Sequence, residues 1–176
     1  PSTLKIQVNA LDSTASLTAS ANVTLALDGG DKQEGTGSVQ AAVAAGFTTG
    51  NVFYQDHGAV NANWLNPFRD LWIKTDVALA DGVLSLGTTL TTNCTSFDRT
   101  HKIPFIPAAT WVRLSLYFPG WQYDTGTTRG IRCWAIIANS DPGVVTLKFD
   151  DLAATRRVTG NMVAHNRVVL PNGPCF

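Results

Sequence analysis

Charged side chains are scarce in this sequence of 176 residues. Lys, Arg, Asp and Glu supply 15% of it, whereas about 25% is usual for soluble domains. Thirteen basic and 13 acidic residues balance to a formal net charge of zero, and no block of one sign is present to follow a phosphate backbone. The composition therefore speaks against a nucleic-acid partner and predicts a surface that is short of charge.

Long apolar runs are also missing. The longest runs, such as Val39–Phe47, are far shorter than the roughly 20 residues that a helix needs to span a bilayer. The amino-terminal stretch, PSTLKIQVNA, has neither the basic nor the apolar region of a signal peptide. We therefore expect no membrane span, and synthesis in the cytoplasm.

Cysteine is rare and shows no recognisable spacing. Cys94, Cys133 and Cys175 are too few and too scattered for a disulfide framework, and no Cys-x-x-Cys pair is present to hold zinc. Free cysteines are among the most often buried residue types. All three are therefore predicted to be buried thiols.

Catalytic motifs are absent as well. His57, His101 and His165 do not have the spacing of zinc ligands, and no Gly-x-Ser-x-Gly nucleophile turn occurs. Asp150 and Asp151 adjoin on a predicted strand, where neighbouring side chains point to opposite faces. They are therefore poorly placed to act together on one glycosidic bond, and the sequence predicts no enzymatic activity.

What the sequence does contain is a series of short segments rich in Val, Thr, Leu and aromatic residues, separated by turn residues. In Trp111–Leu116 every second residue is apolar, as in a strand with one buried face. The Ala-rich stretch 38–45 is compatible with a helix, but the glycines around it favour a strand. Nine strands are predicted: Leu4–Val8, Asn22–Leu27, Gly37–Ala44, Asn51–Tyr54, Asp70–Val77, Gly82–Leu90, Thr110–Phe118, Ile131–Ala138 and Val144–Asp151. This pattern indicates an all-β sandwich of two packed antiparallel sheets.

No repeat, low-complexity tract or linker divides the chain. We therefore expect one sandwich domain, residues 1–155, followed by a C-terminal arm, residues 156–176. Arg167 and Val169 lie in a β-branched run of this arm, which is suited to adding a strand to the sheet edge of a neighbouring subunit. The alternative is an arm that folds back onto its own sandwich.

The order of four segments carries a resemblance to a known fold. They are LALDGGDKQEGTGSVQAAV, DLWIKTDVALADGVLSL, IPAATWVRLSLYF and NSDPGVVTLKFDDLAA. Together they resemble the galactose-binding-like jelly rolls of carbohydrate-binding modules, and the versions of that fold found in bacteriophage virion proteins. The resemblance extends over Leu11–Ala154, roughly four fifths of the chain, and implies a jelly-roll sandwich.

The resemblance also implies a structural calcium ion. In that family an acid-and-glycine turn and an acid pair on the last strand often hold calcium, and the matching positions here are Asp28, with Asp31 or Glu34, and Asp150 with Asp151. Calcium takes about six to eight oxygen ligands, which these carboxylates and loop carbonyls would supply if the two segments adjoin. The alternative is a solvated acidic turn, and no other cofactor is implied.

Aromatic residues in loop-like segments are the candidate binding residues. Trp64, Trp121 and Tyr123 lie near Asn, Asp and Gln residues. Side chains of this kind stack on sugar rings or anchor contacts between subunits. Trp72 and Trp134 lie within predicted strands and are expected to serve in packing instead.

The low charge content favours an assembly. A monomer with so little surface charge and no net charge would be poorly soluble, whereas a subunit of a particle hides much of its surface. We therefore expect a non-enzymatic virion structural protein, a capsid decoration (cement) or tail-associated protein made in the host cytoplasm. Its expected partners are copies of itself in a homo-oligomer and a capsid or tail protein, with no nucleic acid and no membrane. The alternative is a carbohydrate-binding module that recognises glycans through its loop aromatics.

Overall fold

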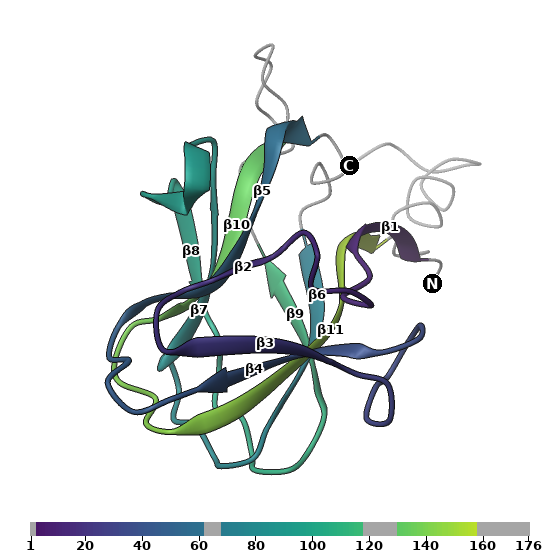
Figure 1. Ribbon diagram of the computed structural model, residues 1–176. Helices are drawn as coiled ribbons and strands as arrows, with labels where there is room; N and C mark the ends of the chain where they lie inside the picture. The colour runs from purple at the N-terminus through teal and green to yellow at the C-terminus, as the bar shows by residue number, and fades with distance from the viewer. Residues whose placement is uncertain (1–2, 62–67, 118–129, 158–176) are drawn as a thin grey trace, which may run out of the picture.

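The computed structural model describes residues 3–61, 68–117 and 130–157 of the chain (Figure 1). Within these ranges, no helix is both long and apolar enough to cross a membrane. The elements are β1 (Thr3–Asn9), β2 (Thr18–Ala19), β3 (Val23–Asp28), β4 (Ser38–Val43), β5 (Gly50–Asn61), β6 (Phe68–Thr75), β7 (Leu84–Thr89), a 3-10 turn η2 (Thr92–Cys94), β8 (Arg99–Lys102), β9 (Val112–Tyr117), β10 (Ile131–Ala138) and β11 (Val145–Arg157).

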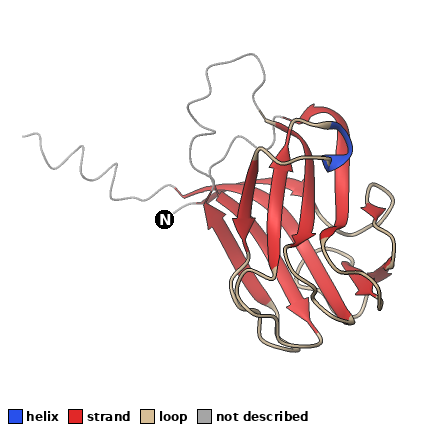
Figure 2. Cartoon of the chain, turned by 90° about the vertical axis from the view of Figure 1, so that its left-hand side faces the viewer, coloured by secondary structure: helices blue, strands red, loops and turns tan. Residues whose placement is uncertain are grey.

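The strands form two antiparallel sheets that pack face to face (Figure 2). Sheet A has the order β3-β4-β11-β6-β9, with β1 added beside β11, and sheet B has the order β2-β5-β10-β7-β8. The predicted fold class, an all-β jelly-roll sandwich of two antiparallel sheets, is confirmed.

Strand β11 organises sheet A. Its first half pairs with β4, its second half pairs with β1, and β6 lies along its other side. The register with β6 shifts between Asp150 and Ala153, which marks a bulge where the neighbour on one side changes from β4 to β1. β11 continues to Arg157, and the rest of the predicted arm, with Arg167 and Val169, lies outside the described residues.

The core between the sheets is built on three aromatic rings. The ring of Phe53 on β5 meets Trp134 of β10 at 5.8 Å and Phe149 of β11 at 5.2 Å, both edge to face. All three side chains are fully buried, and the indole N–H of Trp134 donates a 2.8 Å hydrogen bond to Gln55 Oε1. Buried indole N–H groups usually have such a partner, and the packing role predicted for Trp134 is confirmed.

Each of the nine predicted segments overlaps a strand. On β9, Leu114 and Leu116 are buried while Arg113 and Ser115 are exposed, as the alternation predicts. The Ala-rich stretch forms β4 and not a helix. The structure adds the short strands β2 and β8. β8 has the sequence RTHK and carries no apolar side chain, so it gives no strand pattern.

Candidate functional site

The loop between β3 and β4, residues 28–37, is tied to the outer face of sheet A by lysines. We call it the acidic loop. Asp31 Oδ2 accepts hydrogen bonds from Lys74 Nζ at 2.8 Å and from Lys148 Nζ at 2.7 Å, and Lys148 also bonds Asp28 at 2.7 Å. The indole of Trp111 donates to the second oxygen of Asp31 at 2.7 Å. The hydrogen bond from Lys148 is the main cause of the lowered pKa of both carboxyl groups.

The two acids of the β11 bulge have separate partners. Asp150 Oδ2 accepts the backbone N–H groups of Gln33 and Glu34, at 2.6 and 2.8 Å. Asp151 accepts hydrogen bonds from Lys5 at 2.6 Å and Gln7 at 3.2 Å, both on β1. Burial raises the pKa of Asp150, whose Oδ1 atom is buried and has no hydrogen-bond partner among the described residues.

Glu34 and Asp12 complete this arrangement. Glu34 pairs with the Lys5 ammonium at 2.7 Å, and this hydrogen bond is the first cause of the lowered pKa of Glu34. Asp12 Oδ1 accepts the backbone N–H groups of Thr36 and Gly37, at 2.7 and 2.8 Å. Four N–H groups of the acidic loop therefore point at carboxylates of other segments.

These contacts do not fit the calcium site that the resemblance implies. The structure does bring Asp28, Glu34, Asp150 and Asp151 into one region, but Lys5 and Lys148 or loop N–H groups bond to them. Calcium needs about six to eight oxygen ligands, and the loop presents N–H groups to Asp150 in place of carbonyls. The described residues contain no group of three or more His, Cys, Asp or Glu that would hold a metal ion. The function that we propose therefore does not include a calcium ion.

The first testable consequence is that lysine, and not calcium, holds the acidic loop. We expect the melting temperature to be the same with calcium and with excess chelator, because a cation that bound only the folded state would raise it. Replacing Lys148 by Met is expected to lower the melting temperature, since Asp28 and Asp31 lose a shared partner. Lys102→Met, at an exposed position of β8, is the matched control. A chelator-dependent fall in melting temperature would contradict this interpretation.

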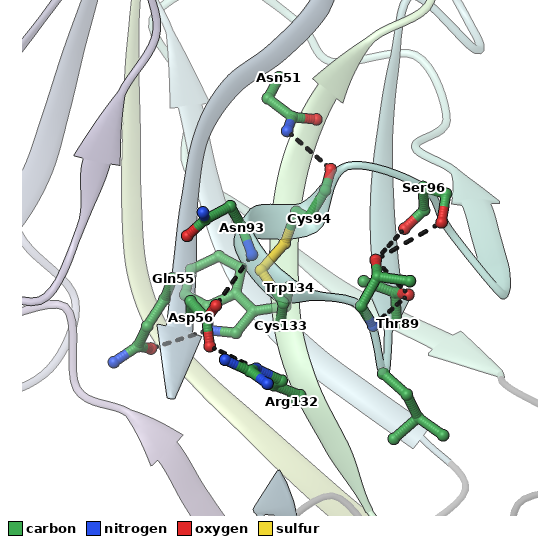
Figure 3. The surroundings of a disulfide bond; sticks show 12 residues. Asn51, Gln55, Asp56, Thr89, Asn93, Cys94, Ser96, Arg132, Cys133 and Trp134 are labelled. Carbon is green, nitrogen blue, oxygen red and sulfur yellow. Dashed lines mark hydrogen bonds and ion pairs between the residues drawn. A yellow bond between two sulfur atoms is a disulfide. The ribbon is translucent and has the colours of Figure 1, made fainter. Parts of the chain in front are cut away.

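The outer face of sheet B is partly covered by the loop between β7 and β8. Cys94, at the end of η2 in this loop, forms a disulfide with Cys133 of β10, 39 residues away in sequence (Figure 3). The prediction of buried thiols is wrong for this pair, although both residues are buried. Sequence spacing gave no sign of it, because the pair forms only when the β7–β8 loop folds back across the sheet. Cys175 lies outside the described residues.

Asp56 of β5 fixes the same loop through its carboxylate. It accepts the backbone N–H of Asn93 at 2.8 Å, the N–H of Gly58 at 2.7 Å and the guanidinium Nε of Arg132 at 3.1 Å (Figure 3). Burial opposes ionisation of Asp56, but these hydrogen bonds outweigh it and lower the pKa. A further bond joins the side-chain amide of Asn51 to the Cys94 carbonyl at 3.2 Å.

The loop also packs closely against Gly87 on β7. A Cβ atom at this position would lie 2.5 Å from both Ile137 Cδ1 and the Phe97 ring. Phe97 belongs to the β7–β8 loop and packs on the apolar cluster of Cys94, Cys133 and Ile137. Because Gly87 has no side chain, the β7–β8 loop can pack closely on sheet B.

We expect Gly87→Ala to destabilise the fold by about 1–3 kcal/mol, the usual cost of overpacking a core. Gly29→Ala is the matched control, because a Cβ there would meet its nearest atom at an ordinary 3.7 Å. Denaturant unfolding of the two variants measures the difference. Equal stability of both variants would show that the loop does not pack on the sheet as described.

Removal of the disulfide is expected to cost more. By loop-closure entropy, a cross-link over 39 residues contributes about 4 kcal/mol. Denaturant unfolding of a Cys94→Ala/Cys133→Ala double variant measures this loss, and a proteolytic digest of unreduced protein should contain the two cysteines in one linked peptide pair. Finding both cysteines as free thiols in protein purified without reductant would refute the assignment.

Beside the covered part, the outer face of sheet B shows a strip of partly exposed side chains. Tyr54, Asp56 and Arg132 are all intermediate in exposure, and Tyr54 packs on the cluster that contains the disulfide. The strip combines an aromatic ring, a carboxylate and a guanidinium. It can therefore offer one apolar surface together with hydrogen-bond acceptors and donors.

The predicted binding aromatics Trp64, Trp121 and Tyr123 lie outside the described residues. The strands that lead to and from their segments can be placed. Asn61 of β5 pairs with Ile131 of β10 in sheet B, and Phe68 of β6 pairs with Tyr117 of β9 in sheet A. These four strand ends lie at one end of the sandwich, the end toward which Asp56 and Arg132 lie in sheet B.

Several residues that form hydrogen bonds in this region were not predicted from the sequence. Lys5 and Lys148 bond predicted calcium ligands, yet only the outward position of Lys148 beside Asp150 hinted at a role on that face. The contact of Asp56 with Arg132 joins residues on β5 and β10 and left no signal in the sequence.

No protein-family model matches the chain, and no curated protein matches it. Solved structures do share its fold. The family 30 carbohydrate-binding module of a cellulosomal cellulase from Clostridium thermocellum superposes with a TM-score of 0.54 at 12% identity, over 88% of this chain and 98% of the module. The family 11 module from Clostridium thermocellum, solved with a β-1,3-1,4-mixed-linked tetrasaccharide, gives 0.53 at 11% identity, over 85% and 94%. A xylan-binding domain from Paenibacillus barcinonensis gives 0.51 at 13% identity, over 87% and 92%.

Enzymes that contain a similar sandwich match only in part. The structure of an arabinose-bound α-L-arabinofuranosidase has a TM-score of 0.58 at 15% identity over 85% of this chain, which spans 25% of that enzyme. At such low identity the similarity establishes the fold. The chain is thus a β-sandwich like those of carbohydrate-binding modules.

Proposed function

We propose that the protein binds glycans through the outer face of sheet B. The observation that carries this proposal is the match of the whole sandwich to carbohydrate-binding modules over more than nine tenths of the length of those module structures. One of these was solved with a mixed-linked tetrasaccharide and another is a xylan-binding domain. The protein therefore shares its architecture with domains whose described role is carbohydrate binding.

The chemistry of the strip supports the proposal. A sugar ring has apolar C–H faces that pack on an aromatic ring, and hydroxyl groups that need donors and acceptors. Tyr54 supplies the ring, while Asp56 and Arg132 are already held in position by their hydrogen bonds. Preorganised polar groups lose little entropy on binding. Trp64 and Trp121, the aromatics predicted from the sequence, lie outside the described residues and remain candidate binding residues.

The disulfide supports an extracellular location for this activity. Disulfides persist in oxidising compartments and are rare in the cytosol. Cys94 and Cys133 are both buried, so the bond serves a structural role on the proposed glycan face. We therefore propose a secreted or surface-displayed glycan binder. The virion location, the homo-oligomer and the capsid or tail partner stay predictions of the sequence.

Affinity electrophoresis in gels that contain mixed-linkage β-glucan, xylan or arabinan tests the proposal. We expect retardation of the wild type by at least one polysaccharide, with roughly tenfold weaker binding, about 1.4 kcal/mol, for Tyr54→Ala and for Trp121→Ala because each loses a stacking ring.

Phe105→Ala is the matched control for these variants. Phe105 is an exposed aromatic near the start of β7, at the other end of sheet B from Asn61 and Ile131, and its loss should leave retardation unchanged. A wild type that binds none of these polysaccharides and no sugar on a glycan array would overturn the proposed function. Specific binding unaffected by Tyr54→Ala would place the site elsewhere.

A further inference from the structure

A pocket lies on the opposite side of the sandwich from the strip on sheet B, on the outer face of sheet A. Its volume is about 270 Å³, and its lining includes Asp31, Lys74, Asp76, Ala109, Thr146 and Lys148. Lys74 of β6 and Lys148 of β11 are directly opposite each other across the two strands. The Asp76 backbone N–H donates to the Thr146 carbonyl at 3.1 Å, and the Thr146 N–H donates to Asp76 Oδ1 at 2.9 Å. We call this cavity the β6–β11 pocket.

The walls of the pocket are fixed by hydrogen bonds. Asp31 holds both lysines through one oxygen, and its other oxygen accepts the Trp111 indole N–H. The backbone N–H of Ala109 donates to the Thr75 carbonyl at 2.6 Å, which closes the pocket at the end of β6. A cavity with walls held in this way is formed before any ligand arrives.

The charges on the lining cancel. Lys74 and Lys148 contribute two positive charges, while Asp31 and Asp76 contribute two negative charges. An anion would find no excess of positive charge there, and a cation would face two ammonium groups. Asp28 lies outside the lining but bonds Lys148, and this third carboxylate further disfavours an anion. A neutral ligand therefore fits the pocket better than an anion or a cation.

The lining also keeps hydrogen-bonding capacity. A lysine ammonium has three N–H donors. Among the described residues, Lys74 Nζ bonds only Asp31, and Lys148 Nζ bonds Asp28 and Asp31. Three donors, two from Lys74 and one from Lys148, are thus available to a ligand, together with the hydroxyl group of Thr146. A ligand rich in hydroxyl groups would satisfy them.

We propose that the β6–β11 pocket is a second binding site, which takes one neutral polyhydroxylated ring, a single sugar residue. Its volume falls just below the roughly 300 Å³ at which pockets for larger small molecules begin. It therefore suits a free sugar or a chain end, and not the interior of a polysaccharide. This site goes beyond the proposed function, because it lies on sheet A and shares no residue with Tyr54, Asp56 or Arg132.

The experiment is saturation-transfer NMR of the full chain with methyl β-D-glucopyranoside, methyl β-D-xylopyranoside and methyl α-L-arabinofuranoside as probes. Thr146→Phe fills the pocket from an outward position on β11. Thr24→Phe is the matched control, because Thr24 lies on the same face of sheet A, two strands away across Ala42. Lys74→Met is a second variant, which removes two free donors and leaves Lys148 to hold Asp31.

We expect at least one probe to give a signal with the wild type and with Thr24→Phe. The signal should fall at least fivefold with Thr146→Phe and with Lys74→Met. Charged probes, D-glucuronate and D-glucosamine, should bind at least fivefold more weakly than the best neutral probe.

Two results would overturn the proposal: no signal from any neutral probe, or the same signal from a folded Thr146→Phe variant. If Thr146→Phe does not fold, Lys74→Met decides alone. Tyr54→Ala separates this site from the proposed function. Loss of polysaccharide retardation with an unchanged sugar signal in that variant would show two independent sites. A lost sugar signal would instead assign the probe to sheet B and refute the second site.

Discussion

The burial of two adjacent carboxylates in the middle of β11 is the constraint on which the rest of sheet A depends. Asp150 is fully buried and Asp151 is 2% exposed, and a buried carboxylate without partners costs several kcal/mol. The bulge in β11 turns the two acids to separate partners. Asp150 takes N–H groups of the acidic loop, while Asp151 takes Lys5. The loop is therefore held on the sheet, and β1 is held beside the second half of β11.

Pairing of opposite charges also stabilises the outer face of sheet A next to these acids. Lys74 and Lys148 lie opposite each other on neighbouring strands, where like charges repel. Asp31 reaches both and relieves the repulsion. With Lys5, three of the five lysines in the chain are engaged with carboxylates of this region. The β6–β11 pocket is the space beside the two paired lysines, so its neutral character follows from the way the acidic loop is held.

Much of the fold was predictable because segments rich in Val, Thr, Leu and aromatic residues mark the long strands, and because strands such as β9 alternate apolar with polar side chains. The strand Ile131–Ala138 was predicted to the residue, whereas β8, a polar edge strand, has no apolar side to reveal it. The site was less predictable. The acids at 28, 34, 150 and 151 do gather, as the resemblance implied, but the two lysines that bond three of them come from different strands, β1 and β11. The Cys94–Cys133 pair depends on how a loop folds over a sheet, which no local pattern records.

Low charge was the reason to expect an assembly, and the structure supplies a second explanation. Among the residues that the structure describes, six acidic residues form ion pairs with Lys or Arg, so much of the charge is neutralised by a neighbouring side chain. The outer face of sheet B offers hydrogen-bond donors and acceptors beside the ring of Tyr54. The outer face of sheet A offers donors from Lys74 and Lys148, which both pair with Asp31. A neutral glycan carries hydroxyl groups and no charge. The surface that binds it therefore needs no net charge. Scarce charge thus fits the proposed sugar-binding surface as well as a subunit contact, and it does not by itself require an assembly.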